Sequence, residues 1–334
     1  SKYSYRVQSG NQFSTWHCFT TAKDRNQMNF LLFGDVQDEL GKDSHYLFME
    51  ANAHYPQAQF WAFVGDVIER PEDKYWNIFL SSIVNIEGDK PLIVCAGNHE
   101  YIKGLHNTLD SRWTDTFMYP DNGDVCHKGS VYYIDFPLLR YIVLNTEGLQ
   151  NAFDYVSTLN WLGKVLSSNK RHWTIVMMHH PVYSSALHRN NLLLKWMFRP
   201  LFDKYKVDMV IAGHDHSYMR RNTGASTPVY LDCNSSTKYY MSNCDPSADR
   251  LCTAHCLYQY IEISDSTLQM KSYLADNDSL YDDIIINKKN NRAQVTSNIG
   301  RKPEMLDIPA THNKAKTLAF VKLRDKRLHS LKYQ

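Results

Sequence analysis

Five short apolar runs, each followed by polar side chains at its end, constrain the fold of this chain more than any other feature. The runs with their polar ends are Asn29–Phe33 before Gly34-Asp35-Val36-Gln37, Phe60–Val64 before Gly65-Asp66, Pro91–Ala96 before Gly97-Asn98-His99-Glu100, Thr174–Met178 before His179-His180, and Asp208–Ala212 before Gly213-His214-Asp215-His216. Short apolar runs bounded by turn residues predict strands buried on both faces. Ligands bind beyond the carboxyl ends of such strands in open α/β sheets. We therefore expect these polar side chains to form one site.

The segments around these runs predict the rest of the fold. Helical patterns are expected at Asp38–His54, after Pro71, at Ser157–Ser168 and at Asn190–Lys206. The pattern predicts an antiparallel hairpin formed by Ser130–Phe136 and Leu139–Thr146. Residues 101–129 are expected to form an irregular loop. From Pro228 onward the pattern changes to strands without helices, at Val229–Cys233, Leu257–Ser264, Thr267–Ala275 and Leu280–Ile286. The predicted fold class is α/β, a four-layer α/β/β/α sandwich of two mixed sheets.

Three regions are predicted along the 334 residues. Residues 1–22 alternate aromatic and polar side chains and predict two short strands joined by Ser9-Gly10-Asn11. Residues 23–287 form the main domain. Residues 288–334 carry twelve Lys/Arg against three Asp/Glu, a net charge of +9, while the whole chain is +2 and the remainder is therefore −7. Since charge runs usually only solvate a surface, a solvated basic extension is the favoured interpretation, and contact with an anionic surface is the alternative.

Composition excludes some classes of protein. The chain is 43% hydrophobic and 22% charged, and no apolar run approaches the ~18–20 residues that a membrane span needs. No signal peptide is expected at Ser1. The seven cysteines leave two alternatives, one or two disulfides or unpaired buried thiols. Cys95 lies inside an apolar run and is expected in the core.

The side chains at the strand ends are of the types that bind metal ions. Two cations ~3.5–4 Å apart clamp the attacking and leaving oxygens of a phosphoryl transfer, and such a pair needs a bridging carboxylate, for which Asp66 fits. The imidazoles of His214 and His216 and the amide of Asn98 favour Mn, Fe(II), Zn or Co over Mg or Ca. With Asp35 and Asp66 as the anionic ligands, two divalent ions leave the site near +2, which favours a phosphate dianion.

The five blocks together resemble the calcineurin-like metallophosphoesterase superfamily, from the first strand to about Ile286. The segment Ser217-Tyr218-Met219-Arg220 is similar to the purple acid phosphatase branch, which often has Tyr-x-Arg after its last histidine. Residues 2–22 resemble the final strands of the fibronectin-type domain that precedes the catalytic domain in that branch. Residues 1–22 are therefore interpreted as a remnant of such a domain, with strands that pair onto the main body as the alternative.

The resemblance implies a role for each residue. One divalent ion would be held by Asp35, Asp66 and His216, and the other by Asp66, Asn98, His179 and His214. Asp66 and His99 would be catalytic, and Asn98 and His99 would contact the substrate. His99 would face the phosphoryl group and stabilise or protonate the leaving oxygen. Glu100 would not bind metal itself but would orient His99 or a metal ligand through a hydrogen bond.

Two positions depart from the purple acid phosphatase pattern. That branch has Gly-Asp-x-x-Tyr, whose tyrosinate binds Fe(III) and gives the colour, whereas this chain has Glu69. We therefore expect no purple band, with Glu69 either solvated or replacing the ligand. Gln37 stands where the branch usually has Gly, and its carbonyl oxygen is the expected additional ligand, with a pocket-lining amide as the alternative. His188 and Arg189 are expected at the rim as substrate-binding residues.

These residues together predict a dinuclear metal-dependent phosphoester hydrolase, in which a metal-bridging hydroxide attacks phosphorus in line. A phosphomonoester is the leading substrate class, as in acid phosphatases. A phosphodiester or nucleotide pyrophosphate is the alternative that Gln37 favours, and an inactive, metal-stabilised binding module is the alternative of another class. The expected partner is a small phosphorylated substrate, with no nucleic-acid-binding signature. By resemblance, the expected location is periplasmic or extracellular.

Overall fold

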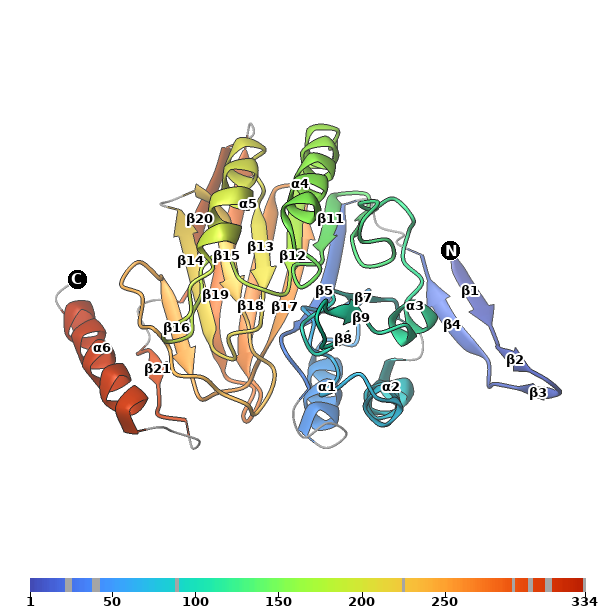
Figure 1. Cartoon of the computed structure of the whole chain (residues 1–334), viewed down its shortest axis with the longest axis horizontal. Helices are drawn as coiled ribbons and strands as arrows, with labels where there is room; N and C mark the ends of the chain where they lie inside the picture. Colours follow the sequence, from blue (N-terminus) through green and yellow to red (C-terminus); the bar gives the residue numbers. More distant parts are fainter. Residues whose placement is uncertain are drawn as a thin grey trace.

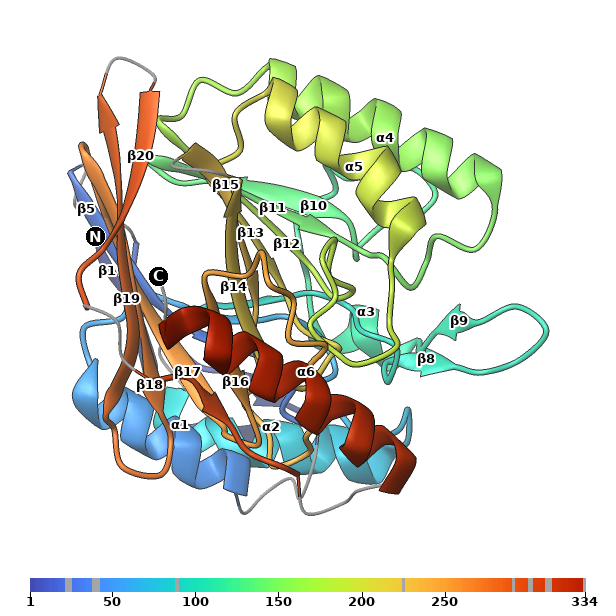
Figure 2. The same ribbon diagram turned by 90° about the vertical axis from the view of Figure 1, so that its left-hand side faces the viewer.

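The computed structural model describes residues 1–21, 26–37, 43–87, 90–223, 226–289, 292–299, 303–309 and 314–332. Two large sheets lie face to face, with one pair of helices on each outer face (Figures 1 and 2). The predicted four-layer α/β/β/α sandwich is therefore confirmed. None of the helices in these ranges is both long enough and apolar enough to cross a membrane.

The first sheet has seven strands. In spatial order they are β20 (Arg292–Ser297), β19 (Leu280–Lys289), β18 (Thr267–Leu274), β17 (Leu257–Ser264), β5 (Gln27–Phe33), β6 (Trp61–Phe63) and β7 (Leu92–Val94). The strands β5, β6 and β7 are parallel, and Phe33, Phe63 and Val94 are neighbours in register. Because these three strands end at the same level, the polar residues that follow them emerge at one edge of the sheet.

The second sheet has eight strands. In spatial order they are β10 (Tyr132–Asp135), β11 (Leu139–Leu144), β12 (Trp173–Met178), β13 (Met209–Ala212), β15 (Ser226–Asp232), β14 (Tyr218–Thr223), β16 (Arg250–Thr253) and β21 (Met305–Leu306). The parallel strands β12 and β13 pair Met177 with Ile211. A bridge between Asp35 and Asn234 links the ends of β5 and β15 across the two sheets.

Helices cover the outer faces of both sheets. The helices are α1 (Asp43–His54), α2 (Asp73–Glu87), α3 (Arg112–Thr116), α4 (Ala152–Ser167), α5 (Leu192–Lys204) and α6 (Lys314–Lys332). α1 and α2 pack on the seven-stranded sheet, and α4 and α5 on the eight-stranded one (Figure 2). Asn151 begins α4 with a capping box, in which its side chain accepts hydrogen bonds from the N–H groups of Phe153 and Asp154. A third apolar core fills the space between the sheets.

The two ends of the chain differ in how they join this body. Strands β1 (Lys2–Tyr5), β2 (Gln8–Ser9), β3 (Gln12–Phe13) and β4 (His17–Thr20) form an exposed antiparallel ribbon that turns at Gly10, as predicted (Figure 1). Its origin in a preceding domain stays a prediction. The described residues of the predicted solvated extension at 288–334 are mostly exposed, but they form regular structure that joins the body. β19 continues past position 287, β20 extends the sheet, and α6 packs on the body through Phe320.

Two further expectations need correction or completion. Residues 101–129 hold more regular structure than expected, namely β8 (Tyr101–Ile102), β9 (Thr108–Leu109) and α3. Five cysteines of the described residues carry free thiols, namely Cys95, Cys126, Cys233, Cys244 and Cys252. These five fit the alternative of unpaired thiols, and Cys95 is buried in the inter-sheet core as predicted.

Candidate metal centre

The polar ends of β5, β6, β12 and β13 converge into two overlapping groups of metal-binding side chains. Asp35, Asp66 and His216 form one group, and Asp66, His179 and His214 the other. Within each group, one donor atom per residue lies within 4.8 Å of the others. Asp66 belongs to both groups, so its carboxylate lies where a bridging ligand must lie. Four of these side chains are buried and His214 is half-buried.

Asn98 completes the second group. Its Oδ1 lies 2.9 Å from Nδ1 of His214 and 3.2 Å from Nε2 of His179, and these two ring nitrogens are 3.2 Å apart. The Nδ1 atom of His179 donates a hydrogen bond to the carbonyl oxygen of Val64, at 2.8 Å. This bond leaves the Nε2 lone pair of neutral His179 directed at the cluster. Three lone-pair donors that face one another fit a cation between them.

Gln37 lies at the edge of the first group. It is fully buried, and its Nε2 lies 3.2 Å from Nε2 of His216 and 3.5 Å from Oδ2 of Asp66, while its Oε1 is buried without a hydrogen-bond partner. The two ends of an amide are assigned from the surrounding hydrogen bonds. If Oε1 and Nε2 of Gln37 exchange places, the oxygen that has no partner faces Oδ2 of Asp66 and Nε2 of His216. The orphaned oxygen fits the prediction that Gln37 is a metal ligand.

Two glycines allow the ligand loops to approach closely. A Cβ on Gly97 would lie 2.2 Å from Oδ1 of Asp66, and one on Gly213 would lie 2.4 Å from Oδ2 of Asp35. Three of the candidate ligands have positive φ angles, which are 51° at Asp66, 71° at His214 and 45° at His216. Such backbone conformations are costly for non-glycine residues and concentrate at functional sites.

Glu100 fixes the backbone around Asp66 rather than the ring of a histidine. Its buried carboxylate accepts hydrogen bonds from the backbone N–H groups of Asp66 at 3.0 Å, Val67 at 2.8 Å, Ile68 at 3.2 Å and Gly97 at 2.7 Å. These bonds tie the loop after β6 to the loop after β7. Of the two roles expected for Glu100, the contacts support orientation of a ligand.

His99 lies beside the cluster with one ring nitrogen available. Its Nδ1 donates to the main-chain carbonyl oxygen of Glu69 at 2.6 Å, and its Nε2 is 3.9 Å from Oδ2 of Asp66. The side chain is 20% exposed, so Nε2 can meet a bound ligand. The side chain of Glu69 belongs to neither ligand group found among the described residues. The contact of Glu69 that bears on the site is therefore the one its carbonyl makes with His99.

The two rim residues have different surroundings. His188 is exposed and has a φ angle of 65°. Arg189 donates from Nη1 to the carbonyl oxygen of His214 at 2.9 Å and to Oδ1 of Asp215 at 3.0 Å, and its guanidinium lies 4.7 Å from the ring centre of Tyr240. Arg189 thus holds the loop that carries His214. Contact of His188 and Arg189 with a substrate stays a prediction.

Sequence reasoning gave too little weight to three polar neighbours of the ligands. The ring centre of His180 is 4.2 Å from that of His214, and its Nδ1 is 2.9 Å from Oγ1 of Thr146. Burial, together with the nearby His179, lowers the pKa of His180 to about 3. The Oγ of Ser236 is 3.3 Å from Nδ1 of His216. The sequence signal for Thr146 was its place at a strand end, whereas Ser236 gives no such signal.

Burial and neighbouring charges shift the pKa values of the ionisable side chains at this site in the metal-free protein. Burial raises the pKa of Asp35 to about 7 and that of Glu100 to about 8. Burial alone would lower the pKa of His179, but the adjacent Asp66 carboxylate outweighs it and raises the pKa to about 10. Burial likewise opposes ionisation of Asp66, yet the charge of His179 holds its pKa well below the usual range. In the metal-free protein, the His179 imidazole and the Asp66 carboxylate thus favour each other's charged forms across the 3.2 Å between Nε2 and Oδ2.

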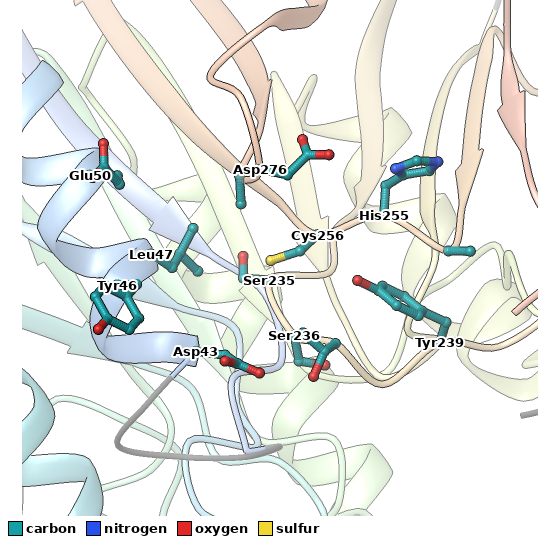
Figure 3. Close-up of a pocket in the computed structure, with 13 residues that line it drawn as sticks. Asp43, Tyr46, Leu47, Glu50, Ser235, Ser236, Tyr239, His255, Cys256 and Asp276 are labelled. Carbon is teal, nitrogen blue, oxygen red and sulfur yellow. The ribbon is translucent and has the colours of Figure 1, made fainter. Parts of the chain in front are cut away.

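A cavity of about 440 Å³ lies between α1 and the segment that follows β15 (Figure 3). Asp43, Leu47 and Glu50 of α1 form one wall of it, and Ser236 another. Because the hydroxyl of Ser236 also contacts His216, one side chain separates this cavity from the candidate ligands.

The Tyr-x-Arg segment after His216 does not join the cluster. The hydroxyl of Tyr218 donates to Oδ2 of Asp282 at 2.8 Å, and Nε of Arg220 reaches the same oxygen at 2.6 Å. Tyr218 is on β14 in the eight-stranded sheet and Asp282 is on β19 in the seven-stranded sheet. This motif therefore clamps the two sheets together.

Comparisons with known proteins agree with this geometry. Residues 28–218, more than half of the chain, match the sequence profile of the calcineurin-like phosphoesterase family. The Fe(3+)-Zn(2+) purple acid phosphatase 12 of Arabidopsis thaliana is 28% identical over 235 residues, which cover 66% of this chain and 49% of that protein. The purple acid phosphatase of Glycine max is 28% identical over 240 residues, covering 66% of this chain and 50% of that protein.

A solved structure shows the same fold. The purple acid phosphatase PPD1 from yellow lupin (Lupinus luteus) seeds superposes with a TM-score of 0.70 at 17% identity, covering 86% of this chain and 59% of that chain. The present chain spans about half the length of the curated relatives that it matches.

Proposed function

Because this chain belongs to the calcineurin-like phosphoesterase family, we propose that it hydrolyses phosphate monoesters at a dinuclear divalent metal centre. The observation that carries the proposal is the position of Asp66 in both groups of candidate ligands. We propose Asp35, Gln37, Asp66 and His216 for one ion and Asp66, Asn98, His179 and His214 for the other. The donor set of two carboxylates, amides and imidazoles fits Mn, Fe, Zn or Co.

Two such ions, when bound, would lower the pKa of water in contact with them. They would also place positive charge beside the phosphoryl oxygens. The protein's own contribution begins with rigid placement. Glu100 fixes the backbone on both sides of Asp66, and Arg189 fixes the carbonyl group of His214. Side chains held in this way need little rearrangement as charge develops on a substrate.

His99 is the proposed acid–base group. Because a carbonyl oxygen can only accept, the bond from Nδ1 to the carbonyl of Glu69 places a proton on Nδ1. The Nε2 atom, which points into the site, is then a donor when the ring is protonated and an acceptor when it is neutral. A protonated ring can donate to the phosphoryl oxygen or to the leaving oxygen, and this supports its proposed role.

A pair of substrates tests the reaction class. Purified protein, loaded with Mn, is expected to hydrolyse p-nitrophenyl phosphate faster than bis(p-nitrophenyl) phosphate, and a chelator is expected to abolish both activities. Faster hydrolysis of the diester would favour the phosphodiesterase alternative. An absence of turnover on both, at a measured metal content of two per chain, would favour a binding module.

Two finer points belong to the same proposal. The resemblance to purple acid phosphatases supports a periplasmic or extracellular location, which fractionation of the source cells would test. The absence of the expected tyrosine, with Glu69 in its place, supports an all-divalent centre. Elemental analysis of the protein as isolated would identify both ions.

A further inference from the structure

The loop after β13 carries a buried aspartate between two candidate metal ligands. Asp215 stands between His214 and His216 in the chain, and its side chain is fully buried. It belongs to neither group of candidate ligands found among the described residues. Because a buried carboxylate is costly unless hydrogen-bond donors or opposite charges surround it, its partners indicate what it holds in place.

The partners of Asp215 lie in the segment that follows β12. Its Oδ2 accepts hydrogen bonds from the backbone N–H groups of Ser185 at 2.8 Å and Ala186 at 3.1 Å, and from the hydroxyl of Ser184. Its Oδ1 accepts from Nη1 of Arg189 at 3.0 Å. Among the described residues, four donors therefore surround the carboxylate, and all of them come from the segment that carries the predicted rim residues.

Arg189 joins the two segments a second time. The Nη1 atom that contacts Asp215 also donates to the main-chain carbonyl oxygen of His214, at 2.9 Å. One guanidinium therefore bridges the side chain of Asp215 and the backbone of the residue before it. Because charge-assisted hydrogen bonds are stronger than neutral ones, these contacts hold the loop after β13 and the segment after β12 as one unit.

We propose that Asp215 is a positioning residue of the metal centre. Its bonds to the segment after β12 fix the backbone of His214 and His216, whose imidazoles must each keep a lone pair directed at an ion. The inference rests on the proposed metal centre, and it adds a residue that acts only through its neighbours. Removal of a hydrogen-bonded group that supports metal ligands lowers metal affinity ~10–100-fold.

Two variants break the pair of Asp215 and Arg189 from opposite sides. In Asp215→Asn, the amide oxygen can still accept from the N–H groups of Ser185 and Ala186, but the NH₂ group meets Arg189 as a second donor. Arg189→Gln changes a side chain that is 34% exposed, so this variant is expected to fold even if the buried substitution impairs folding.

Titration of the metal-free full chain with Co²⁺ measures the effect, with the visible absorption of bound Co²⁺ as the signal. Each variant should bind Co²⁺ ~10–100-fold more weakly than the parent. Since both substitutions remove the same pair, the double variant should lose about as much affinity as the weaker of the single variants, and not the product of the two losses. Circular dichroism should show the secondary structure of the parent in each variant.

A matched control breaks an ion pair of the same kind elsewhere. Nε of Arg140 donates to Oδ1 of Asp135 at 2.7 Å near the start of β11, whereas the metal centre lies beyond the ends of the neighbouring strands. Asp135→Asn should therefore keep the Co²⁺ affinity of the parent.

Three outcomes would overturn the proposal. The first is a Co²⁺ affinity that is the same in the parent, Asp215→Asn and Arg189→Gln, which would leave the metal centre standing and refute the role of Asp215 alone. The second is an equal loss of affinity in Asp135→Asn, which would show a general effect on stability. The third is a parent that binds no Co²⁺, which would overturn the metal centre and this inference together.

Discussion

Substitution of Gly97 by alanine tests whether the position of Asp66 controls the site. An added Cβ would lie 2.2 Å from Oδ1 and 2.4 Å from the backbone nitrogen of Asp66. Ordinary contact begins at 3.4 Å, so the carboxylate and the loop that carries it must retreat by about 1.2 Å. Overpacking of this kind costs ~1–3 kcal/mol of stability. A displacement of about 1 Å at a reacting centre lowers kcat by ~10²-fold.

The measurements for this variant are the metal content per chain, kcat with p-nitrophenyl phosphate, and the melting temperature. Gly163→Ala is the control, because it lies within α4 and its Cβ would meet nothing within 4 Å. It should raise stability by about 1 kcal/mol and leave kcat unchanged. If Gly97→Ala keeps two ions and full turnover, the placement of the ligands does not depend on this close approach, and the reasoning is refuted.

Three further results are expected. His99→Ala should retain two ions but lose ~10²–10⁴-fold in kcat; unchanged turnover would remove His99 from the mechanism. Iron-loaded protein should show no strong visible absorption band, because residue 69 is Glu; a strong band would reveal another tyrosine ligand. In chelator, the melting temperature should fall as pH rises from 6.5 to about 10, the window above the ordinary pKa of histidine, where the depressed pKa values of His180, His214 and His216 no longer contribute. Asp35, Glu100 and His179 have raised folded-state pKa values, so their stabilisation is present at low pH and lost as pH rises through those values. A melting temperature that climbs over this range would contradict the expectation.

The sequence predicted the ends of the buried strands well, because hydrophobic runs and the glycines that end them are local signals. The expected run Asn29–Phe33 is β5, and Asp208–Ala212 is β13, each within two residues. Convergence of Asp35 and His216, which lie far apart in the chain, was predicted from the strand order of an open sheet. The candidate ligands meet as that rule requires.

What the sequence left open depends on contacts between distant segments. The pairing of Arg327 with Glu304 and the burial of Phe320 turn a basic segment into a docked helix, and no charge count reveals that pairing. The hydrogen bonds of Glu100 run to backbone groups, which carry no residue signature. Ser236 reaches His216 from a loop of ordinary composition. Each of these contacts is set by tertiary packing, which a local pattern does not encode.

The most direct test of the account is an anomalous-scattering map from crystals of the Mn- or Zn-loaded protein. The account predicts two peaks, with a carboxylate oxygen of Asp66 in contact with each and the imidazoles of His216 and His179 on separate ions. One peak alone, or two peaks of which only one touches Asp66, would contradict it.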